Sequence, residues 1–220
     1  MTWRITMTGD AAVTVSFPPR IDPDISARVV ALADTVRASG YPGVRDVVPS
    51  YHTVTVYLDP IRTDLDRLWT ALEEAAAAPL DPGRSPRDIV VPVVYGGEVG
   101  PDLDEVARFA GVSPQEVIRL HTQRRYRVYM VGFLAGFPYM GTVDARIAIP
   151  RRATPRHAVA AGSVGIAGEQ TGIYPATAPG GWHLIGRATV EPFDPGRDPP
   201  CLWRPGDRVA FESVMAGGGR

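Results

Sequence analysis

The chain has 220 residues, of which 45% are hydrophobic and 21% are charged, and its formal net charge is −1. This is the composition of a folded globular protein and excludes global disorder, and the length allows two domains of about 100 residues or one larger one. With so little net charge we expect neither nucleic acid nor a membrane as a partner. A single cysteine, Cys201, excludes an intrachain disulfide and any zinc site with two or more cysteines, as is typical of a reducing compartment.

The chain contains no lysine, because all 23 of its lysine and arginine residues are arginine. It therefore cannot carry a Walker A phosphate loop, a lysine Schiff base or a biotin attachment site. We expect this chain to bind no cofactor itself. Any ATP or biotin chemistry in which it takes part would need lysines from a partner protein.

The first residues, 1–9, lack the 7–15-residue apolar stretch of a signal peptide. No apolar run reaches the roughly 18 residues of a membrane helix. We therefore expect a cytoplasmic protein.

Strand and helix patterns alternate over the first part of the chain. Apolar side chains recur every second residue in the strands and every third or fourth residue in the helices. The predicted elements are strands at 3–7 and 11–17, a helix at 22–38, strands at 44–49 and 53–58, and a helix at 64–77. This order predicts an α+β domain of the ferredoxin-like type over residues 1–86.

The segment 79–86 holds three prolines and a glycine and is the best domain boundary, which leaves 87–220 as the second domain. That domain opens with a predicted strand at 88–95 and helices at 102–110 and 113–121. Ser113 fits the cap of the second helix.

The chain from Gly132 onward is rich in glycine and proline, with short apolar segments between these residues. Short strands separated by such turns are typical of a barrel or a folded sheet. The predicted strands are 143–149, 159–166, 182–185 and 209–211, and residues 217–220 are expected to be a frayed tail.

Four arginines gather within eleven residues, at positions 146, 151, 152 and 156. Guanidinium groups bind carboxylates and phosphates bidentately, and Pro150 and Pro155 stiffen the backbone that carries them. An anion site is one interpretation. The other is a solvated loop whose arginines pair with Asp144, Glu169 or Asp207, and the residues alone do not decide between the two.

Aromatic residues alternate with glycines over 132–141. Phe133, Phe137 and Tyr139 would share one face of an extended chain, either in the core or as the floor of a groove. The four histidines lack the spacing of a helical metal pair. Polar groups beside glycines at 170–174 and 179–186 would suit a small polar amide if they converged on a pocket.

Six segments, in this order, resemble the family of the bacterial 5-oxoprolinase B subunit, also called allophanate hydrolase subunit 1 or KipI-like. They are Gly132-Phe-Leu-Ala-Gly-Phe-Pro-Tyr139, Pro150-Arg-Arg-Ala-Thr-Pro-Arg156, Ala161-Gly-Ser-Val-Gly-Ile-Ala-Gly168, Gln170-Thr-Gly-Ile-Tyr-Pro175, Pro179-Gly-Gly-Trp-His-Leu-Ile-Gly-Arg187 and Pro205-Gly-Asp-Arg-Val209. The match is dense over residues 88–211 and looser before them. Several ordered motifs are far more specific than a single pattern.

The resemblance implies a cyclophilin-like β-barrel behind a small α/β domain. It also implies a heteromeric complex with a homologous C subunit, similar to allophanate hydrolase subunit 2, and a lactam-activating A subunit. That complex would convert 5-oxo-L-proline to L-glutamate with ATP hydrolysis, or act on a related urea-derived amide. The alternative is a KipI-like inhibitor of a sensor histidine kinase.

Residue type and motif position then predict roles for individual residues, none of which is carried over from known catalytic residues. Arg152 and Arg156 would hold a substrate carboxylate or a phosphorylated intermediate. The amide would be oriented by Gln170, Thr171 and Tyr174. Proton transfer would fall to His121 or His183, since histidine changes charge near neutral pH.

Overall fold

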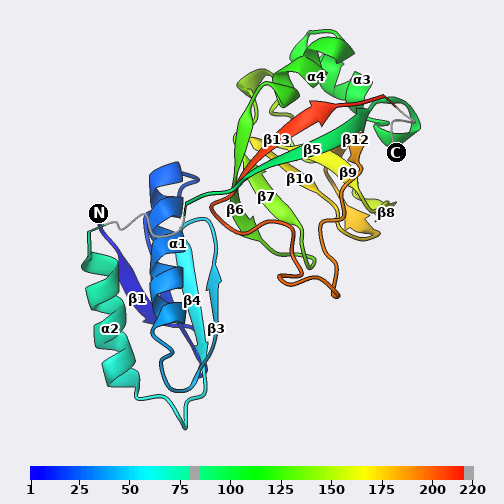
Figure 1. The fold of residues 1–220 in the computed structure, drawn as a ribbon. Coiled ribbons are helices and arrows are strands. Elements are labelled where there is room, and N and C mark those ends of the chain that lie inside the picture. Colours follow the sequence, from blue (N-terminus) through cyan, green and yellow to red (C-terminus); the bar gives the residue numbers. More distant parts are fainter. Residues whose placement is uncertain (80–84, 216–220) are drawn as a thin grey trace. The chain divides into compact units, whose positions relative to one another are not determined.

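The computed structural model describes residues 1–79 and 85–215, and the chain divides into two compact units, residues 1–86 and 87–220 (Figure 1). Most of the proline-rich segment 79–86 and the predicted tail at 217–220 lie outside the described residues. Within the described part of the chain, no helix combines the length and the apolar character that crossing a membrane requires.

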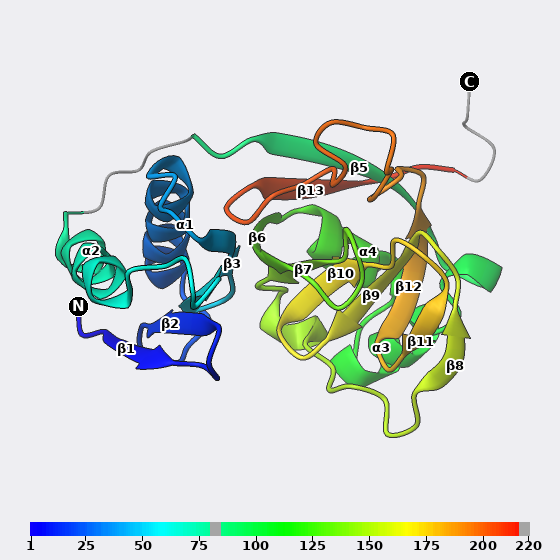
Figure 2. The ribbon, with the colours of Figure 1, turned by 90° about the horizontal axis from the view of Figure 1, so that it is seen from below.

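The first unit is a four-stranded antiparallel sheet with two helices on one face (Figure 2). The strands are ordered β1-β2-β4-β3 across the sheet. The elements are β1 (Arg4–Met7), β2 (Ala12–Ser16), α1 (Pro23–Ala38), β3 (Val44–Pro49), β4 (Thr53–Leu58) and α2 (Leu65–Ala77). Each matches its predicted range within one residue at either end.

Local hydrogen bonds explain why these helices begin where the sequence predicts. The Asp22 carboxylate accepts from the backbone N–H groups of Asp24 (2.9 Å) and Ile25 (3.1 Å), and Pro23 occupies the first turn of α1. Asp64 caps α2 in the same way through the N–H of Arg67 (3.1 Å). A capped helix with one apolar face then buries that face on the sheet.

In the second unit, seven strands of the described chain close a barrel in the order β10-β7-β6-β13-β5-β12-β9. The pair β13–β5 is parallel and the other pairs are antiparallel. The strands are β5 (Asp88–Tyr95), β6 (Arg125–Val131), β7 (Pro138–Gly141), β9 (Ser163–Ala167), β10 (Gln170–Ile173), β12 (His183–Ala188) and β13 (Arg208–Ser213). The prediction of a barrel in this part of the chain is confirmed.

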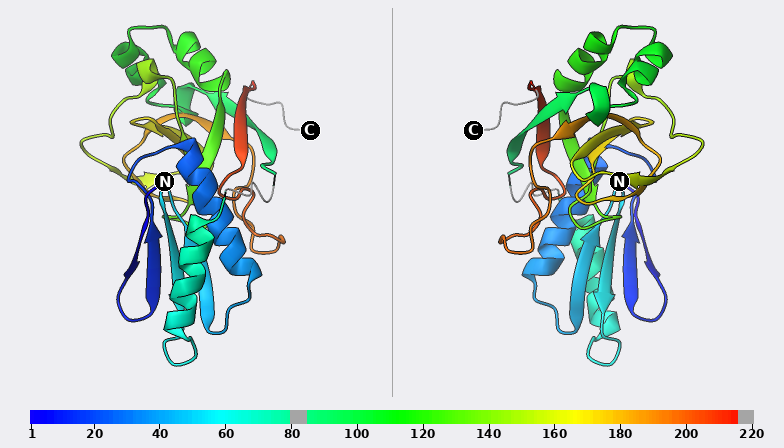
Figure 3. Two further views of the ribbon diagram at one scale, coloured as in Figure 1. Left: turned by 90° about the vertical axis from the view of Figure 1, so that its left-hand side faces the viewer. Right: turned by 90° about the vertical axis from the view of Figure 1, so that its right-hand side faces the viewer.

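Short elements surround this barrel. Helices α3 (Leu103–Ala110) and α4 (Pro114–Thr122) lie side by side at one end of it (Figure 3). The 3-10 turn η1 (Gly97–Val99) leads from β5 towards α3, and a second turn, η2 (Ala145–Ile147), follows β7. A two-stranded ribbon pairs β8 (Arg156–Val159) with β11 (Ala178–Gly180).

Two of the predicted strands are wrong in detail. The segment 143–149 holds η2 instead of a strand, because the Asp144 carboxylate accepts from the N–H of Arg146 (3.1 Å) and starts a 3-10 turn. The segment 159–166 is split between β8 and β9 by a turn in which Gly162 has a φ of +79°. Turn chemistry overrides apolar content at both places.

The extended chain predicted over 132–141 is wrong for residues 132–137, although the three aromatic rings do lie together. The chain turns sharply there: the N–H of Gly132 bonds to the carbonyl of Phe137 (3.1 Å), and Phe133 has a φ of +69°. Phe133 is therefore 60% exposed while Phe137 is buried. The ring of Phe137 nevertheless contacts both other aromatics, with its centre 5.7 Å from that of Phe133 and 4.9 Å from that of Tyr139. It also packs edge-on against Trp182 in a small core cluster.

Gly100 allows the start of α3 to approach β12 closely. A Cβ atom at this position would lie 2.2 Å from the carbonyl oxygen of Ile185. We expect Gly100→Ala to lower the free energy of unfolding by about 1–3 kcal/mol, the usual cost of overpacking, measured by urea denaturation. Gly196→Ala is the control, since its new methyl group would meet only the Asp194 carboxylate, at 3.3 Å. Equal stability of the two variants would contradict this account of Gly100.

Candidate functional site

The second unit contains a cluster of charged side chains that surround one carboxylate. Asp102 immediately precedes α3, and its side chain is 5% exposed. One carboxylate oxygen, Oδ1, accepts from Arg156 Nη2 (2.7 Å) and Arg152 Nη1 (3.2 Å). The other, Oδ2, accepts from the backbone N–H of Leu184 (2.7 Å). Together with Glu105 and His183, these three charged residues form what we call the Asp102 cluster.

Backbone hydrogen bonds bring the members of this cluster together from distant parts of the chain. The N–H of Asp102 donates to the carbonyl of Leu184 on β12 (2.9 Å), which ties the start of α3 to the barrel. The N–H of Arg152 donates to the carbonyl of Gly181 (2.9 Å). Arg156 begins β8 opposite Gly180 of β11. The arginines are therefore held by the ribbon and the loop before it.

Glu105 and His183 complete the cluster. Glu105 Oε2 lies 3.4 Å from Arg152 Nη1 and 3.6 Å from His183 Nδ1. The other ring nitrogen of His183, Nε2, lies 3.0 Å from the carbonyl oxygen of Pro150. Because a carbonyl can only accept, Nε2 carries the proton. The His183 side chain is 4% exposed, whereas that of Glu105 is 43% exposed.

Unpaired polar atoms are concentrated in this cluster. Among the described residues, five buried side-chain nitrogen or oxygen atoms lack a hydrogen bond, and three of them are Arg152 Nε, Arg156 Nη1 and His183 Nδ1. Leaving a buried donor or acceptor unpaired costs about 1–3 kcal/mol. Buried atoms without a partner in a native protein require an explanation, and one such explanation is that they bind a ligand. We therefore take the Asp102 cluster as the candidate functional site.

The same residues could hold a metal ion by distance alone. One donor atom each from Asp102, Glu105 and His183 lies within 4.8 Å of the other two. However, both carboxylates already accept hydrogen bonds from guanidinium groups, which supply two positive charges. A divalent cation would have to displace them against charge repulsion. The arrangement is that of an ion-pair network.

Tyr174 lies beside this network. Its phenol is hydrogen-bonded to the backbone N–H of Trp182, and burial raises the pKa of Tyr174 although Arg151 and Arg156 act in the opposite direction. Glycine at position 180 makes room for this hydroxyl, since a Cβ there would lie 2.2 Å from Tyr174 Oη. The Arg151 guanidinium lies 5.9 Å from the centre of the Trp182 ring.

His121 occupies a different environment, inside the barrel. Its Nε2 lies 2.9 Å from Thr171 Oγ1, and its Nδ1 lies 2.7 Å from the Tyr95 hydroxyl. Because Thr171 donates to the carbonyl of Gly165 (3.0 Å), it accepts from Nε2–H, and Nδ1 accepts from Tyr95. The ring stacks on Phe211, and burial lowers the pKa of His121 to about 3. His121 is a neutral, fully hydrogen-bonded part of the core.

The structure thus brings together only some of the residues to which the sequence assigned chemistry. Arg152, Arg156 and His183 meet at Asp102, with Tyr174 beside them. His121 and Thr171 bond to each other in the barrel interior, a position that gives no support to their roles in proton transfer and amide binding. Gln170 is half-buried at the start of β10, opposite Ala167 of β9.

The predicted alternative for the arginines, pairing with nearby acids, is observed in part. Arg146 pairs with Asp144 (3.0 Å), as expected. Arg152 and Arg156 instead pair with Asp102, which no sequence pattern had indicated. Aspartate before a helix normally indicates a cap, but the Asp102 side chain makes no capping hydrogen bond here. The segment Gly100–Ala107, which contains Asp102 and Glu105, carried no pattern that ties it to residue 152.

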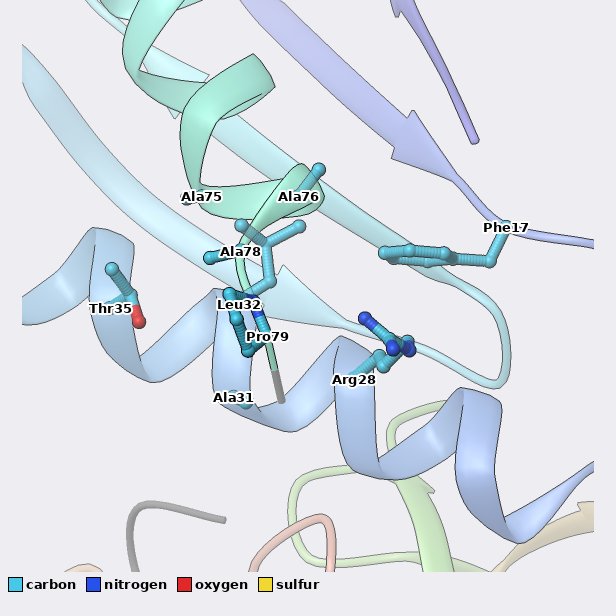
Figure 4. Close-up of a pocket in the computed structure, with 9 residues that line it drawn as sticks. All are labelled: Phe17, Arg28, Ala31, Leu32, Thr35, Ala75, Ala76, Ala78 and Pro79. Carbon is cyan, nitrogen blue, oxygen red and sulfur yellow. The ribbon is translucent and has the colours of Figure 1, made fainter. Parts of the chain in front are cut away.

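A cleft in the first unit lies between α1 and α2 (Figure 4). Its lining is mainly small and apolar, with Leu32, Ala76 and Pro79 around it, and Arg28 and Thr35 are its polar side chains. Polar groups do not converge there as they do at Asp102, so it offers no comparable chemistry.

Comparison with known proteins places nearly the whole chain in a single protein family. The family described as carboxyltransferase domain, subdomain C and D, matches residues 3–203. The 5-oxoprolinase B subunit of Bacillus subtilis is 40% identical over 96% of this chain and 93% of its own length. The protein of the same name from Escherichia coli O157:H7 is 43% identical over 94% of each chain.

Among solved structures, TTHA0988 superposes with a TM-score of 0.85 at 37% sequence identity. The match covers 95% of this chain but 41% of the TTHA0988 chain, which is therefore much the longer of the two. By its carboxyltransferase-domain match and these relatives, the chain belongs to the family of the 5-oxoprolinase B subunit.

The Asp102 carboxylate should contribute strongly to stability. We expect Asp102→Ala to lower the free energy of unfolding by about 3–5 kcal/mol, because two largely buried guanidiniums would lose their counter-charge. Urea denaturation at neutral pH measures the change. Asp104→Ala, two residues along at an exposed position, should change stability by less than about 0.5 kcal/mol. A loss no larger at Asp102 than at Asp104 would show that the network is not stabilising.

His121 should make stability depend on pH. Its pKa is lowered to about 3 in the folded chain, so between pH 3 and the unfolded value of about 6.5 the unfolded chain binds more protons. The stabilisation that comes from keeping His121 uncharged is present above pH 6.5 and is lost as the pH falls. His121 should therefore lower the free energy of unfolding by about 2 kcal/mol from pH 7 to pH 5.

Urea denaturation at the two pH values tests this expectation. The loss assigned to His121 should be missing in His121→Gln and retained in the exposed-residue control His157→Gln. An unchanged pH dependence in His121→Gln would contradict the assignment.

Proposed function

We propose that this chain is a subunit of a heteromeric, ATP-dependent 5-oxoprolinase that converts 5-oxo-L-proline to L-glutamate. The observation that carries the proposal is the similarity, along nearly the full length of both chains, to two proteins named as the B subunit of 5-oxoprolinase. The Asp102 cluster is consistent with it, because a small substrate with a carboxylate and an amide needs a few convergent polar groups in a rigid setting.

The substrate carboxylate would bind Arg152 and Arg156. In each of these guanidiniums, one nitrogen donates to Asp102 and another has no hydrogen-bond partner. Guanidinium groups can bind more than one carboxylate because they carry five N–H donors in a plane. The proposal thus gives the unpaired donors an acceptor.

We place the amide beside Tyr174 and proton transfer at His183. The Tyr174 hydroxyl lies near the arginines, and His183 Nδ1 is a buried nitrogen with no hydrogen-bond partner. His121 is a poorer candidate than His183 because both its ring nitrogens are already bonded. A nitrogen that takes up a proton and later passes it on must not already be bonded to another group.

ATP would be bound by a partner protein, since a chain without lysine has no phosphate-loop lysine to offer. We propose two partners, a homologous C subunit and a lactam-activating A subunit. The names of the relatives, which call each of them a B subunit, support partner subunits.

We also propose finer fold assignments for the two units. The barrel would be cyclophilin-like. The first unit would be ferredoxin-like, with β1 beside β2 at the position where that fold has its fourth strand, which the order β1-β2-β4-β3 supports.

The proposed function is tested by co-expressing the chain with its candidate partners and measuring glutamate release from 5-oxo-L-proline with and without ATP. Release should require ATP and every component of the complex. Arg152→Ala should lower kcat/KM roughly 10- to 100-fold, because a charge-assisted hydrogen bond is worth about 1.5–3 kcal/mol. The complex should still assemble.

Arg108→Ala, an exposed arginine on α3, is the matched control and should keep full activity. No release by the folded, complete complex would disprove the proposed reaction. A normal rate for Arg152→Ala would disprove the role of that arginine.

A further inference from the structure

Glu105 lies between the guanidinium of Arg152 and the ring of His183. Its Oε2 atom is 3.4 Å from Arg152 Nη1, a long contact for an ion pair, and 3.6 Å from His183 Nδ1. Its side chain is 43% exposed, whereas the carboxylate of Asp102 is 5% exposed and accepts three hydrogen bonds. Of the two carboxylates at Arg152, Glu105 is therefore the one that can move.

The tautomer of His183 makes its contact with Glu105 dependent on a proton. Because Nε2–H donates to the Pro150 carbonyl (3.0 Å), the neutral ring presents a lone pair at Nδ1. A lone pair and a carboxylate oxygen cannot bond to each other. If Nδ1 takes up a proton, the same two atoms form a charge-assisted hydrogen bond of about 2.7–2.9 Å after a shift of less than about 1 Å.

The charges of the cluster balance before any ligand binds. Asp102 and Glu105 from the start of α3 contribute two negative charges, and Arg152 and Arg156 from the ribbon side contribute two positive charges. A His183 ring without a proton at Nδ1 adds no charge. A ligand carboxylate at Arg152 would leave the site with one excess negative charge. Uncompensated charge in a largely buried site is costly, and uptake of one proton removes it.

We propose that Glu105 is an exchangeable carboxylate, which a ligand carboxylate replaces at Arg152 while His183 takes up one proton at Nδ1 and pairs with the displaced Glu105. The proton comes from solvent and no covalent bond in the ligand changes. Binding of an anionic ligand is thereby coupled to proton uptake. This inference rests on the proposed function, since it takes the ligand to be the substrate carboxylate.

The experiment is a calorimetric titration of the assembled complex with 5-oxo-L-proline, without ATP, in buffers of different ionisation enthalpy. At about pH 7.5, where an ordinary histidine is neutral, the wild-type complex should take up about one proton for each ligand bound. In Glu105→Gln the competing carboxylate is gone, so the ligand should bind without proton uptake and about tenfold more tightly.

A second variant tests the histidine. His183→Gln keeps an N–H donor for Pro150 but cannot take up a proton, and its proton uptake should fall to zero. Two controls at exposed neighbouring positions, Asp104→Asn and His157→Gln, should bind and take up a proton as the wild type does.

The outcomes separate this inference from the proposed function. Ligand binding without proton uptake in the wild type, or unchanged uptake in Glu105→Gln, overturns the exchange and leaves the proposed function standing. Absence of any 5-oxo-L-proline binding or turnover by the complete complex overturns both.

Discussion

The arrangement of the candidate site depends on one buried carboxylate. Asp102 binds two guanidiniums with one oxygen and a backbone N–H of β12 with the other, so a single side chain joins the start of α3, the loop before β8, β8 itself and the barrel wall. Its near-complete burial makes each of these hydrogen bonds stronger than it would be in water. The same burial means that the arginines and Asp102 need one another, since any of them alone would be an uncompensated charge.

The two buried histidines differ in their hydrogen bonding, and this difference distinguishes a histidine of the core from one that can bind a ligand or a proton. Both rings are almost fully buried. His121 has a partner at each nitrogen, stacks on Phe211 and has no reason to change its protonation near neutral pH. His183 has a partner at Nε2 and none at Nδ1, which faces a carboxylate. Burying the His121 ring costs little free energy because both its nitrogens are hydrogen-bonded. The unpaired Nδ1 of His183 is the atom at which a ligand or a proton can bind.

The absence of lysine from the sequence suits a network of this kind. One nitrogen of Arg152 lies within 3.4 Å of both Asp102 and Glu105, and the rest of its guanidinium remains available. A planar, delocalised and weakly hydrated cation can bridge two carboxylates at a smaller desolvation cost than a compact ammonium group. Whatever the origin of the arginine-only composition, it places at this site the side chain that binds carboxylates most specifically.

Local pattern determined the fold of the first unit and most of the elements up to α4, because caps and apolar periodicity act over a few residues, as at Asp22 and Asp64. The motifs also identified the family and the barrel. Where turn chemistry competed with apolar content, as at Asp144 and Phe133, pattern alone was misleading. Only the tertiary structure revealed Asp102 and Glu105, because their partners lie 47 to 82 residues away. The barrel strand β12 brings Leu184 to them, and the ribbon and the loop before it bring the arginines.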